Sequence, residues 1–547
     1  MRASLIAALA LAALASCAEP GDDGAAGGET AGTTATADAP GPPPGAATLP
    51  GNLLDGSIRP EDAVAAYLER IERVDRSGPT LQSVLAVNPD AIADARALAA
   101  ARAGGAAPGP LYGLPILVKD NIETQELPTT AGSRALLAND TGRDAPAIAR
   151  LRAAGAIILG KTNLSEWANF RSTGSISGWS AVGGLTRNPH DLSRNACGSS
   201  SGSGAAVAAG LAWAALGTET NGSVTCPAAL NGIVGFKPTV GLVSRRHVVP
   251  ISPSQDTIGP MTTSVRDAAM LLSVMAGTDE MDPATAEADA RKVDYVAALR
   301  RARLEGLRLG VLRWAQSGDA REQAVFEEAL ARAEEGGAVL VDIEAWGGER
   351  PGEASFTVLK AEFKDSLNAY LADAAPAVNA RTLDDLIAFN EADPRELALF
   401  DQDIFEESQE MPGMNDEAYR EALATVRRTT RDEGIDRLLS ENDVDLLVAP
   451  SFGVAFTIDP VRGDVIGSRA GAGWVAAIAG YPHLTIPMGD VKGLPLGLSV
   501  MGGQWQDAEV LKAGHALEAV LPPRLEPGYR ESAFTDPAIA AAMRSEN

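Results

Sequence analysis

The stretch CGSSSGSGAAVAAG, residues 197–210, places four serines and three glycines in its first eight positions, ahead of an alanine-rich run. A stretch of this kind could carry a nucleophilic serine, cradle a phosphate group, or form a flexible loop in front of a helix. The segments on either side of it decide between these possibilities.

Short apolar runs alternate with helical patterns along most of the chain. Residues 115–119 and 156–159 are apolar runs with strand character, and residues 144–155 between them have apolar positions at helical spacing. The alternation resumes near the C-terminus, where residues 443–450 and 483–489 have strand character. Strands that alternate with helices indicate an α/β fold.

Helix start and stop signals agree with this pattern. Asn88 is placed as the N-cap of a helix that ends at Gly104. Ser264 and Asp267 have capping-box spacing at the start of another helix. Residues 280–440 are more charged, have helical character and lack glycine-rich loops, so we expect them to form a helical insertion or cover.

The N-terminus has the architecture of a signal peptide, which we expect over residues 1–16. Arg2 precedes an apolar run from Leu5 to Ala15, which is too short to span a bilayer. The ending LASC resembles the bacterial lipobox, which implies acylation of Cys17 and membrane attachment through the lipid. The alternative is an ordinary secretory signal.

Composition divides the rest of the chain. Residues 17–50 are rich in Gly, Ala, Pro and Thr, so we expect a disordered tether there, followed by a folded domain over 51–530 and a tail over 531–547.

The net charge of −26, from 72 acidic and 46 basic residues, repels phosphate backbones and argues against a nucleic-acid partner.

The chain has three cysteines, and only Cys197 and Cys226 remain after Cys17. This number excludes a disulfide framework. One bridge between the two is possible, but we favour two small buried thiols.

Residues 155–162, GAIILGKT, satisfy the P-loop pattern that would bind a nucleotide. A P-loop requires a strand before its first glycine and a bendable loop after it. Here a helical pattern precedes Gly155, and residues 156–159 have the pattern of a buried strand. We therefore reject the nucleotide-binding interpretation.

Residues 198–202, GSSSG, match the nucleophile elbow of α/β-hydrolases, with Ser200 at the centre. The elbow requires a strand running into it, whereas a polar loop precedes this one. A triad would also require a downstream histidine, and none of the three available has a distinctive setting: His247, His483 and His515.

A second serine has a more suitable neighbourhood. In GTETNGSVTCPAALNG, residues 217–232, consecutive small residues before Ser223 leave backbone N–H groups free to point at one spot, as in an oxyanion hole. The alternative is an ordinary tight turn. Lys119, at the end of an apolar run, could serve as the base if burial keeps it neutral, and its alternative is a solvated pair with Asp120.

Three segments together resemble the amidase signature hydrolases: residues 113–121, 197–210 and 217–239, in the family's order and spacing. The similarity returns at residues 480–489 and 493–502. Residues 160–184 and 237–252 are most similar to the peptide amidase branch. The resemblance implies a mixed central β-sheet covered by helices on both sides, and a small-residue helix over 205–216.

The same resemblance implies the chemistry. It assigns Ser223 as the nucleophile, Lys119 as the base and Ser199, after a cis peptide bond, as the proton relay between them. It also assigns four backbone N–H groups to the oxyanion hole, those of Thr220, Asn221, Gly222 and Ser223. The resemblance implies neither a metal nor an organic cofactor.

Four positions depart from the family pattern: Cys197 and Ser201 stand where glycine is usual, Asn221 replaces an oxyanion-loop glycine, and Thr225 takes a position that is often arginine. Asn tolerates left-handed backbone, so the loop can keep its geometry. The departures bear on substrate range more than on catalysis.

These observations predict a secreted, lipid-anchored serine amidase that converts carboxylic amides to acid and ammonia, with C-terminal peptide amides as expected substrates. Other acyl or aryl amides, or a non-catalytic solute-binding lipoprotein, are the alternatives. We expect a monomer in the bacterial cell envelope, facing the periplasm or outer membrane and attached to the membrane only by its lipid.

Overall fold

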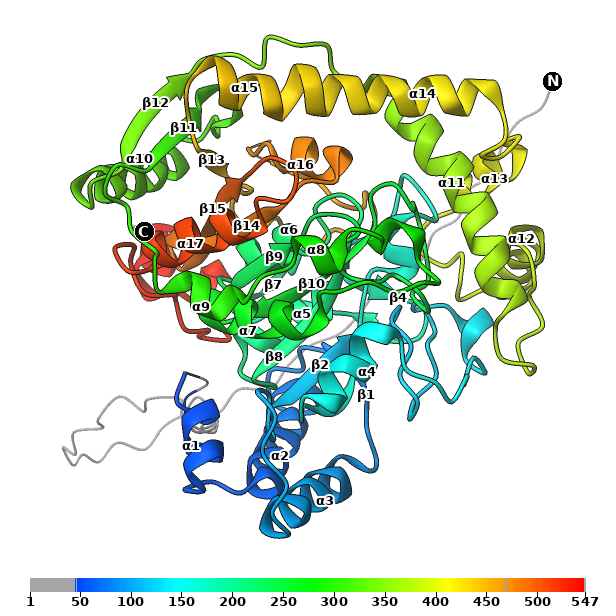
Figure 1. Ribbon diagram of the computed structural model, residues 1–547. Helices are drawn as coiled ribbons and strands as arrows, with labels where there is room; N and C mark the ends of the chain where they lie inside the picture. The colour runs from blue at the N-terminus through cyan, green and yellow to red at the C-terminus, as the bar shows by residue number, and fades with distance from the viewer. Residues whose placement is uncertain (1–44, 46, 468–469, 546–547) are drawn as a thin grey trace, which may run out of the picture. The chain divides into compact units, whose positions relative to one another are not determined.

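The computed structural model describes residues 45, 47–467 and 470–545 (Figure 1). Cys17, the expected signal peptide and most of the expected tether therefore lie outside the described residues. Within these residues, no helix combines the length and apolar character that crossing a membrane requires. Helix α1 (Leu49–Asp55) begins two residues before the expected domain boundary, and α18 (Pro537–Ala542) lies within the expected tail.

One eleven-stranded mixed sheet organises the chain, in the order β1-β3-β2-β8-β10-β9-β14-β15-β13-β11-β12. Strand β2 pairs in parallel with β3 and β8, whereas β8–β10, β9–β14 and β14–β15 are antiparallel. The strands are β1 (Val84–Val87), β2 (Pro115–Lys119), β3 (Ile157–Thr162), β8 (Ala214–Glu219), β9 (Val234–Lys237), β10 (Thr257–Thr262), β11 (Arg308–Leu312), β12 (Val339–Ile343), β13 (Leu446–Pro450), β14 (His483–Val491) and β15 (Leu494–Met501).

Helices flank this sheet. Every residue of β2, β3, β8 and β10 is buried, which requires cover on both faces because neighbouring side chains point in opposite directions. The mixed, helix-covered sheet predicted from the sequence is confirmed. The remaining α-helices are α2 (Pro60–Arg70), α3 (Ala91–Ala103), α4 (Pro146–Ala153), α5 (Ser201–Ala208), α6 (Thr225–Leu230), α7 (Val265–Met275), α8 (Ala288–Arg291), α9 (Tyr295–Leu299), α10 (Ala320–Glu335), α11 (Gly352–Ala372), α12 (Leu383–Ala392), α13 (Asp403–Glu410), α14 (Glu417–Arg427), α15 (Asp436–Glu441), α16 (Gly473–Ala479) and α17 (Asp507–Glu518).

Two small sheets lie outside the large one. They are formed by β4 (Trp179–Ser180) with β5 (Gly184–Leu185), and by β6 (Arg187–Asn188) with β7 (Asp191–Asn195). Strand β7 ends two residues before Cys197, so this second hairpin leads directly into the serine-rich stretch.

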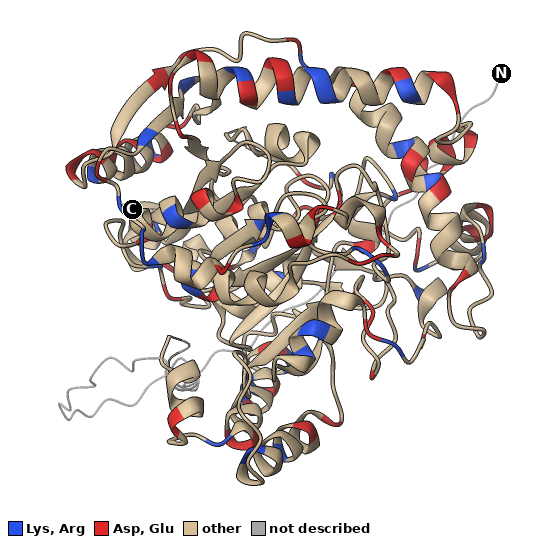
Figure 2. Ribbon diagram, in the orientation of Figure 1, with Lys and Arg blue, Asp and Glu red and all other residues tan. Residues whose placement is uncertain are grey.

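Residues 280–440 are not helical throughout, which corrects the expectation for this range. Strands β11 and β12 pair in parallel within the large sheet and are joined by α10, a crossover that the charged sequence concealed. Strand β12 is an edge strand with mostly exposed or half-buried residues, so it lacks an apolar signature. The helices α11–α14 do form a cover, and acidic and basic residues intersperse along them (Figures 1 and 2).

Helix caps follow the predicted signals approximately. Helix α3 begins after Asp90 rather than Asn88, because the Asn88 side chain accepts the Asp90 N–H at 2.8 Å and forms the turn before the helix. Ser264 accepts the Asp267 N–H at 3.1 Å at the start of α7, as capping-box spacing predicts.

The serine-rich stretch forms α5, which begins at Ser201 and ends at Ala208, so the helix expected over 205–216 is displaced. Gly210, with φ +67°, ends the helical path, and Ala214 already belongs to β8. A side chain could not fit at Gly202, where a Cβ would lie 2.3 Å from the Ser83 carbonyl oxygen. Glycine there allows α5 to lie against the sheet.

A buried ion cluster joins the cover to the sheet domain. The Arg171 guanidinium contacts Glu166 and lies 3.2 Å from Glu396, and none of the three side chains is exposed. Burial raises the pKa of Glu166 well above its ordinary range, although Arg171 opposes this shift. The guanidinium also stacks over Phe400 at 4.1 Å from the ring centroid.

Replacement of Arg171 by Met is expected to lower the free energy of unfolding by about 3 to 5 kcal/mol, because two buried carboxylates lose their common counter-charge. Urea unfolding measures the change. Lys512→Ala, which removes a partly exposed partner of Glu509, is the control and is expected to change stability by less than about 0.5 kcal/mol. Equal losses in the two variants would contradict the prediction.

Candidate active site

Lys119 stands at the carboxyl end of β2, next to the parallel strand β8. Its Nζ lies 2.7 Å from Ser199 Oγ, 2.8 Å from Thr218 Oγ1 and 3.3 Å from the Thr218 carbonyl oxygen. The side chain is fully buried. The alternative of a solvated lysine paired with Asp120 does not hold, because Asp120 pairs with Lys161 at 3.1 Å.

Burial lowers the pKa of Lys119 to about 7, while the charges of Asp256 and Glu219 act in the opposite direction. A substantial fraction of the amine is therefore neutral at neutral pH. If the neutral amine donates its two N–H groups to the Thr218 oxygens, its lone pair is directed at Ser199. Thr218 was not among the residues selected from the sequence.

Ser199 connects the two serine-containing segments. The peptide bond between Gly198 and Ser199 is cis, and the Ser199 carbonyl oxygen accepts the Ser165 N–H at 3.0 Å. The next residue, Ser200, donates its N–H to the Ser223 carbonyl oxygen at 3.1 Å. This bond places the backbone of Ser223 beside the residue that follows Ser199.

Ser223 follows a turn that opens toward solvent. Asn221 is exposed, Gly222 is half-buried with φ +83°, and Ser223 is 8% exposed. Among the described residues, no group accepts a hydrogen bond from the backbone N–H groups of the turn residues Thr220, Asn221, Gly222 and Ser223. These four donors are available to a ligand.

A cavity of about 560 Å³ reaches this turn. Thr218, Thr220 and Asn121 are among its polar lining residues, and most of the wall is apolar, with Val249 and Tyr370 as examples. A cavity of this size accommodates a small molecule or a few residues of a peptide.

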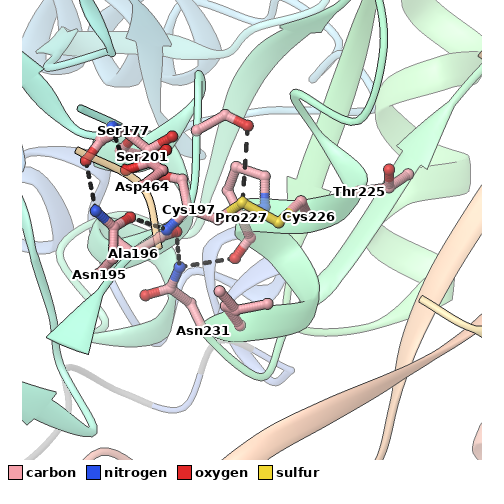
Figure 3. The surroundings of a disulfide bond; sticks show 12 residues. Ser177, Asn195, Ala196, Cys197, Ser201, Thr225, Cys226, Pro227, Asn231 and Asp464 are labelled. Atoms are coloured by element: carbon pink, nitrogen blue, oxygen red, sulfur yellow. Dashed lines mark hydrogen bonds between the residues drawn. A yellow bond between two sulfur atoms is a disulfide. The ribbon is translucent and has the colours of Figure 1, made fainter. Parts of the chain in front are cut away.

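The disulfide between Cys197 and Cys226 ties the same two segments together (Figure 3). The expectation of two buried thiols is therefore wrong. A spacing of 29 residues gives no sign of the pairing, which arises because α6 returns beside the residues that precede α5. The Asn231 amide reinforces this link by donating to the Ala196 and Pro227 carbonyl oxygens at 2.9 and 2.7 Å.

Removal of this bridge is expected to destabilise the protein without abolishing its fold. The loop of 29 residues that it closes corresponds to about 3.6 kcal/mol of stability. Urea unfolding of Cys197→Ser/Cys226→Ser, with and without dithiothreitol, measures the effect. Reductant should lower the wild-type stability to that of the variant and leave the variant unchanged, and a wild type insensitive to reductant after confirmed thiol release would contradict the prediction.

The P-loop pattern and the GSSSG motif, both rejected as functional motifs from the sequence, belong to the framework of the fold. Residues 157–162 of the P-loop pattern form β3, and Lys161 is buried. The Ser200 hydroxyl donates to the Thr218 carbonyl oxygen at 3.2 Å and, among the described residues, has no histidine partner. His483 instead contacts Ser499 at 2.6 Å.

The departures from the family pattern have structural roles. Ser201 donates to the Cys197 carbonyl oxygen, and Thr225 donates its hydroxyl to Glu219 at 3.1 Å. Glu219 and Asp256 were missed by sequence reasoning. Glu219 lies within the quoted stretch but resembles an ordinary strand end, and Asp256 lies in a loop without a motif.

Comparison with known proteins agrees with this geometry. A family model described as amidase matches residues 62–511. This chain belongs to the amidase signature family. It is 37% identical to a glutamyl-tRNA(Gln) amidotransferase subunit of Oleidesulfovibrio alaskensis, over 85% of this chain and 95% of that protein.

Two solved amidase structures are similar throughout. The native peptide amidase of Stenotrophomonas maltophilia is 45% identical, with a TM-score of 0.83, over 89% of this chain and 98% of that one. The peptide amidase PAM in complex with the competitive inhibitor chymostatin is also 45% identical, with a TM-score of 0.84, over 88% of this chain and 99% of that one. The chain is therefore an amide hydrolase of this amidase family.

Proposed function

We propose that this amidase hydrolyses C-terminal peptide amides to the free acid and ammonia through an acyl-enzyme on Ser223. The observation that carries the proposal is the contact of 2.7 Å between the fully buried Lys119 amine and Ser199, beside the Ser223 segment. A neutral amine in this position can receive a proton.

In the first half-reaction, Ser223 Oγ attacks the amide carbonyl carbon while its proton passes to Ser199, whose own proton passes to Lys119. The N–H groups of residues 220–223 stabilise the negative charge on the carbonyl oxygen. The C–N bond then breaks, and the relay returns the proton to the departing nitrogen, which leaves as ammonia.

In the second half-reaction, water attacks the acyl-enzyme and gives a proton to the same relay. The bond to Ser223 breaks, the carboxylic acid leaves, and the serine recovers its proton. Asn121 and Thr220 line the cavity and are placed to contact the substrate.

Similarity to peptide amidases and the size of the cavity support the peptide substrate. Ammonia release from a panel of C-terminal peptide amides, aliphatic amides and anilides is the test. The proposal requires kcat/KM to be highest for peptide amides, and a preference for aryl or simple acyl amides would reassign the substrate class. Absence of turnover and of covalent labelling in folded protein would support a solute-binding role instead.

We also propose that the protein is a monomeric lipoprotein of the bacterial cell envelope, anchored through Cys17. The signal-like N-terminus and the lipobox-like ending support this proposal. Cell fractionation tests it, since wild type should sediment with membranes and Cys17→Ala should not. Equal distribution of both forms would contradict the anchor, and sedimentation velocity of detergent-free Cys17→Ala protein would test the monomer.

A further inference from the structure

Carboxylates hold both ends of the turn formed by residues 220–223, a buried one from Glu219 and a half-buried one from Asp256. At one end, the Thr220 hydroxyl donates to Asp256 at 2.5 Å. At the other end, Glu219 Oε2 accepts the N–H groups of Val224 and Thr225 at 2.8 and 2.9 Å. Glu219 therefore binds the two backbone N–H groups that directly follow Ser223. It does not bind the four N–H groups of the turn, which remain free for a substrate.

The second oxygen of Glu219 has no such structural use. The side chain is 1% exposed, and Oε1 has no hydrogen-bond partner among the described residues. A buried carboxylate oxygen without a hydrogen-bond partner lowers the stability of the fold, and a neutral side chain with one acceptor oxygen could accept the same two backbone hydrogen bonds. The charge of Glu219 therefore requires an explanation beyond capping.

That charge acts on the buried Lys119. The described charged groups whose fields influence Lys119 are Asp256, from the loop before β10, and Glu219, at the end of β8. Glu219 also acts on the buried Lys237 and His483, which lie on β9 and β14. Glu219 is thus connected to both parts of the proposed mechanism, the turn and the base.

We propose that Glu219 is a positioning residue for the hydrolysis: its carboxylate orders the turn after β8 by holding the Val224 and Thr225 N–H groups, next to Thr218, whose oxygens contact Lys119. This inference rests on the proposed function of Lys119 and Ser223. Glu219 itself touches neither the substrate nor the reacting atoms.

Two substitutions separate the roles. Glu219→Gln keeps an acceptor oxygen but removes the charge, so the pKa of Lys119 should fall and the acidic limb of the kcat/KM profile should move to lower pH by about half a unit or more. Glu219→Ala also removes the acceptor, so kcat should fall by about 100-fold with little change in KM, because the turn loses its order.

Asp75→Asn is the matched control. Asp75 is equally buried and accepts three hydrogen bonds, from the Ser83 N–H and hydroxyl and from the Val84 N–H, but its charge is not among those that act on Lys119. This substitution should reduce stability and leave the acidic limb in place.

Direct titration of Lys119 makes the test independent of turnover. NMR of protein labelled with ¹³C at lysine Cε, assigned through Lys119→Met, should show a lower Lys119 pKa in Glu219→Gln. An unchanged pKa and an unchanged acidic limb would overturn the inference, as would an equal shift in Asp75→Asn. Failure of the proposed function would instead appear as a Lys119 that titrates as expected in a protein without amidase activity.

Discussion

The Ser223→Ala variant is expected to lose covalent labelling by a fluorophosphonate and to have kcat/KM reduced by about 10⁴-fold or more, as loss of the nucleophile causes in other serine hydrolases. The structure gives no reason for the variant to misfold, because Ser223 lies in a turn that is partly open to solvent. Labelling followed by intact mass, together with ammonia release, measures both effects.

Ser200→Ala is the matched control for this prediction. Ser200 stands at the centre of the GSSSG motif, only one residue after Ser199, and its hydroxyl bonds to the backbone of Thr218. Labelling should persist in Ser200→Ala. If labelling survives in Ser223→Ala but disappears in Ser200→Ala, the nucleophile is Ser200 and our assignment of Ser223 is wrong.

The Lys119→Met variant is expected to lose about 10³-fold in kcat/KM, since general base catalysis typically contributes about 10² to 10⁴. In wild type, the acidic limb of kcat/KM should lie near pH 7, with activity falling as pH falls, because protonation of Lys119 removes the base. The residual activity of the variant should lack this limb.

The Lys119→Met variant, although less active, should be more stable than wild type. The pKa of Lys119 is lower in the folded than in the unfolded chain, so the unfolded chain binds more protons between about pH 7 and 10.5 and wild-type stability rises with pH across that window. Near pH 7 the buried amine costs about 5 kcal/mol, at about 1.4 kcal/mol per pKa unit. Lys119→Met should therefore be more stable than wild type at pH 7, by an amount that shrinks toward pH 10.

Lys237 offers a matched control for both effects. It is equally buried, burial lowers its pKa to about 8, and it contacts the Pro238 carbonyl oxygen at 3.2 Å. Lys237→Met should gain stability in the same way and retain most of the activity. A comparable loss of activity in both variants would show that buried lysines here support the fold in general, and that Lys119 has no special role.

Sequence reasoning succeeded where local chemistry determines structure. The apolar run ending at Lys119 forms β2, and the small residues before Ser223 form an open turn, because these features depend on a few neighbouring residues. The Asp90 cap of α3 and the true start of α5 at Ser201 differ from expectation by a few residues, since helix ends depend on side-chain contacts that a pattern does not contain.

Features that depend on distant contacts could not be predicted. The Cys197–Cys226 bridge, the pairing of β11 with β12, and the fields of Glu219 and Asp256 at Lys119 arise only when segments far apart in sequence are packed together. In the charged range 280–440, an edge strand with a half-exposed pattern resembles a solvated helix, which explains why the sheet there was missed.

The close approach of α5 to its neighbours restricts how this enzyme can be re-engineered. Any side chain at Gly202 would meet the Ser83 and Asn163 backbone, and one at Gly204 would press on Asn231 and Pro227. Mutant libraries that include Gly202 would mostly yield unfolded clones, because backbone atoms leave no room for a side chain there. Laboratory evolution toward new amides should instead randomise the cavity wall at positions such as Val249 and Met414, where variation leaves the helix in place.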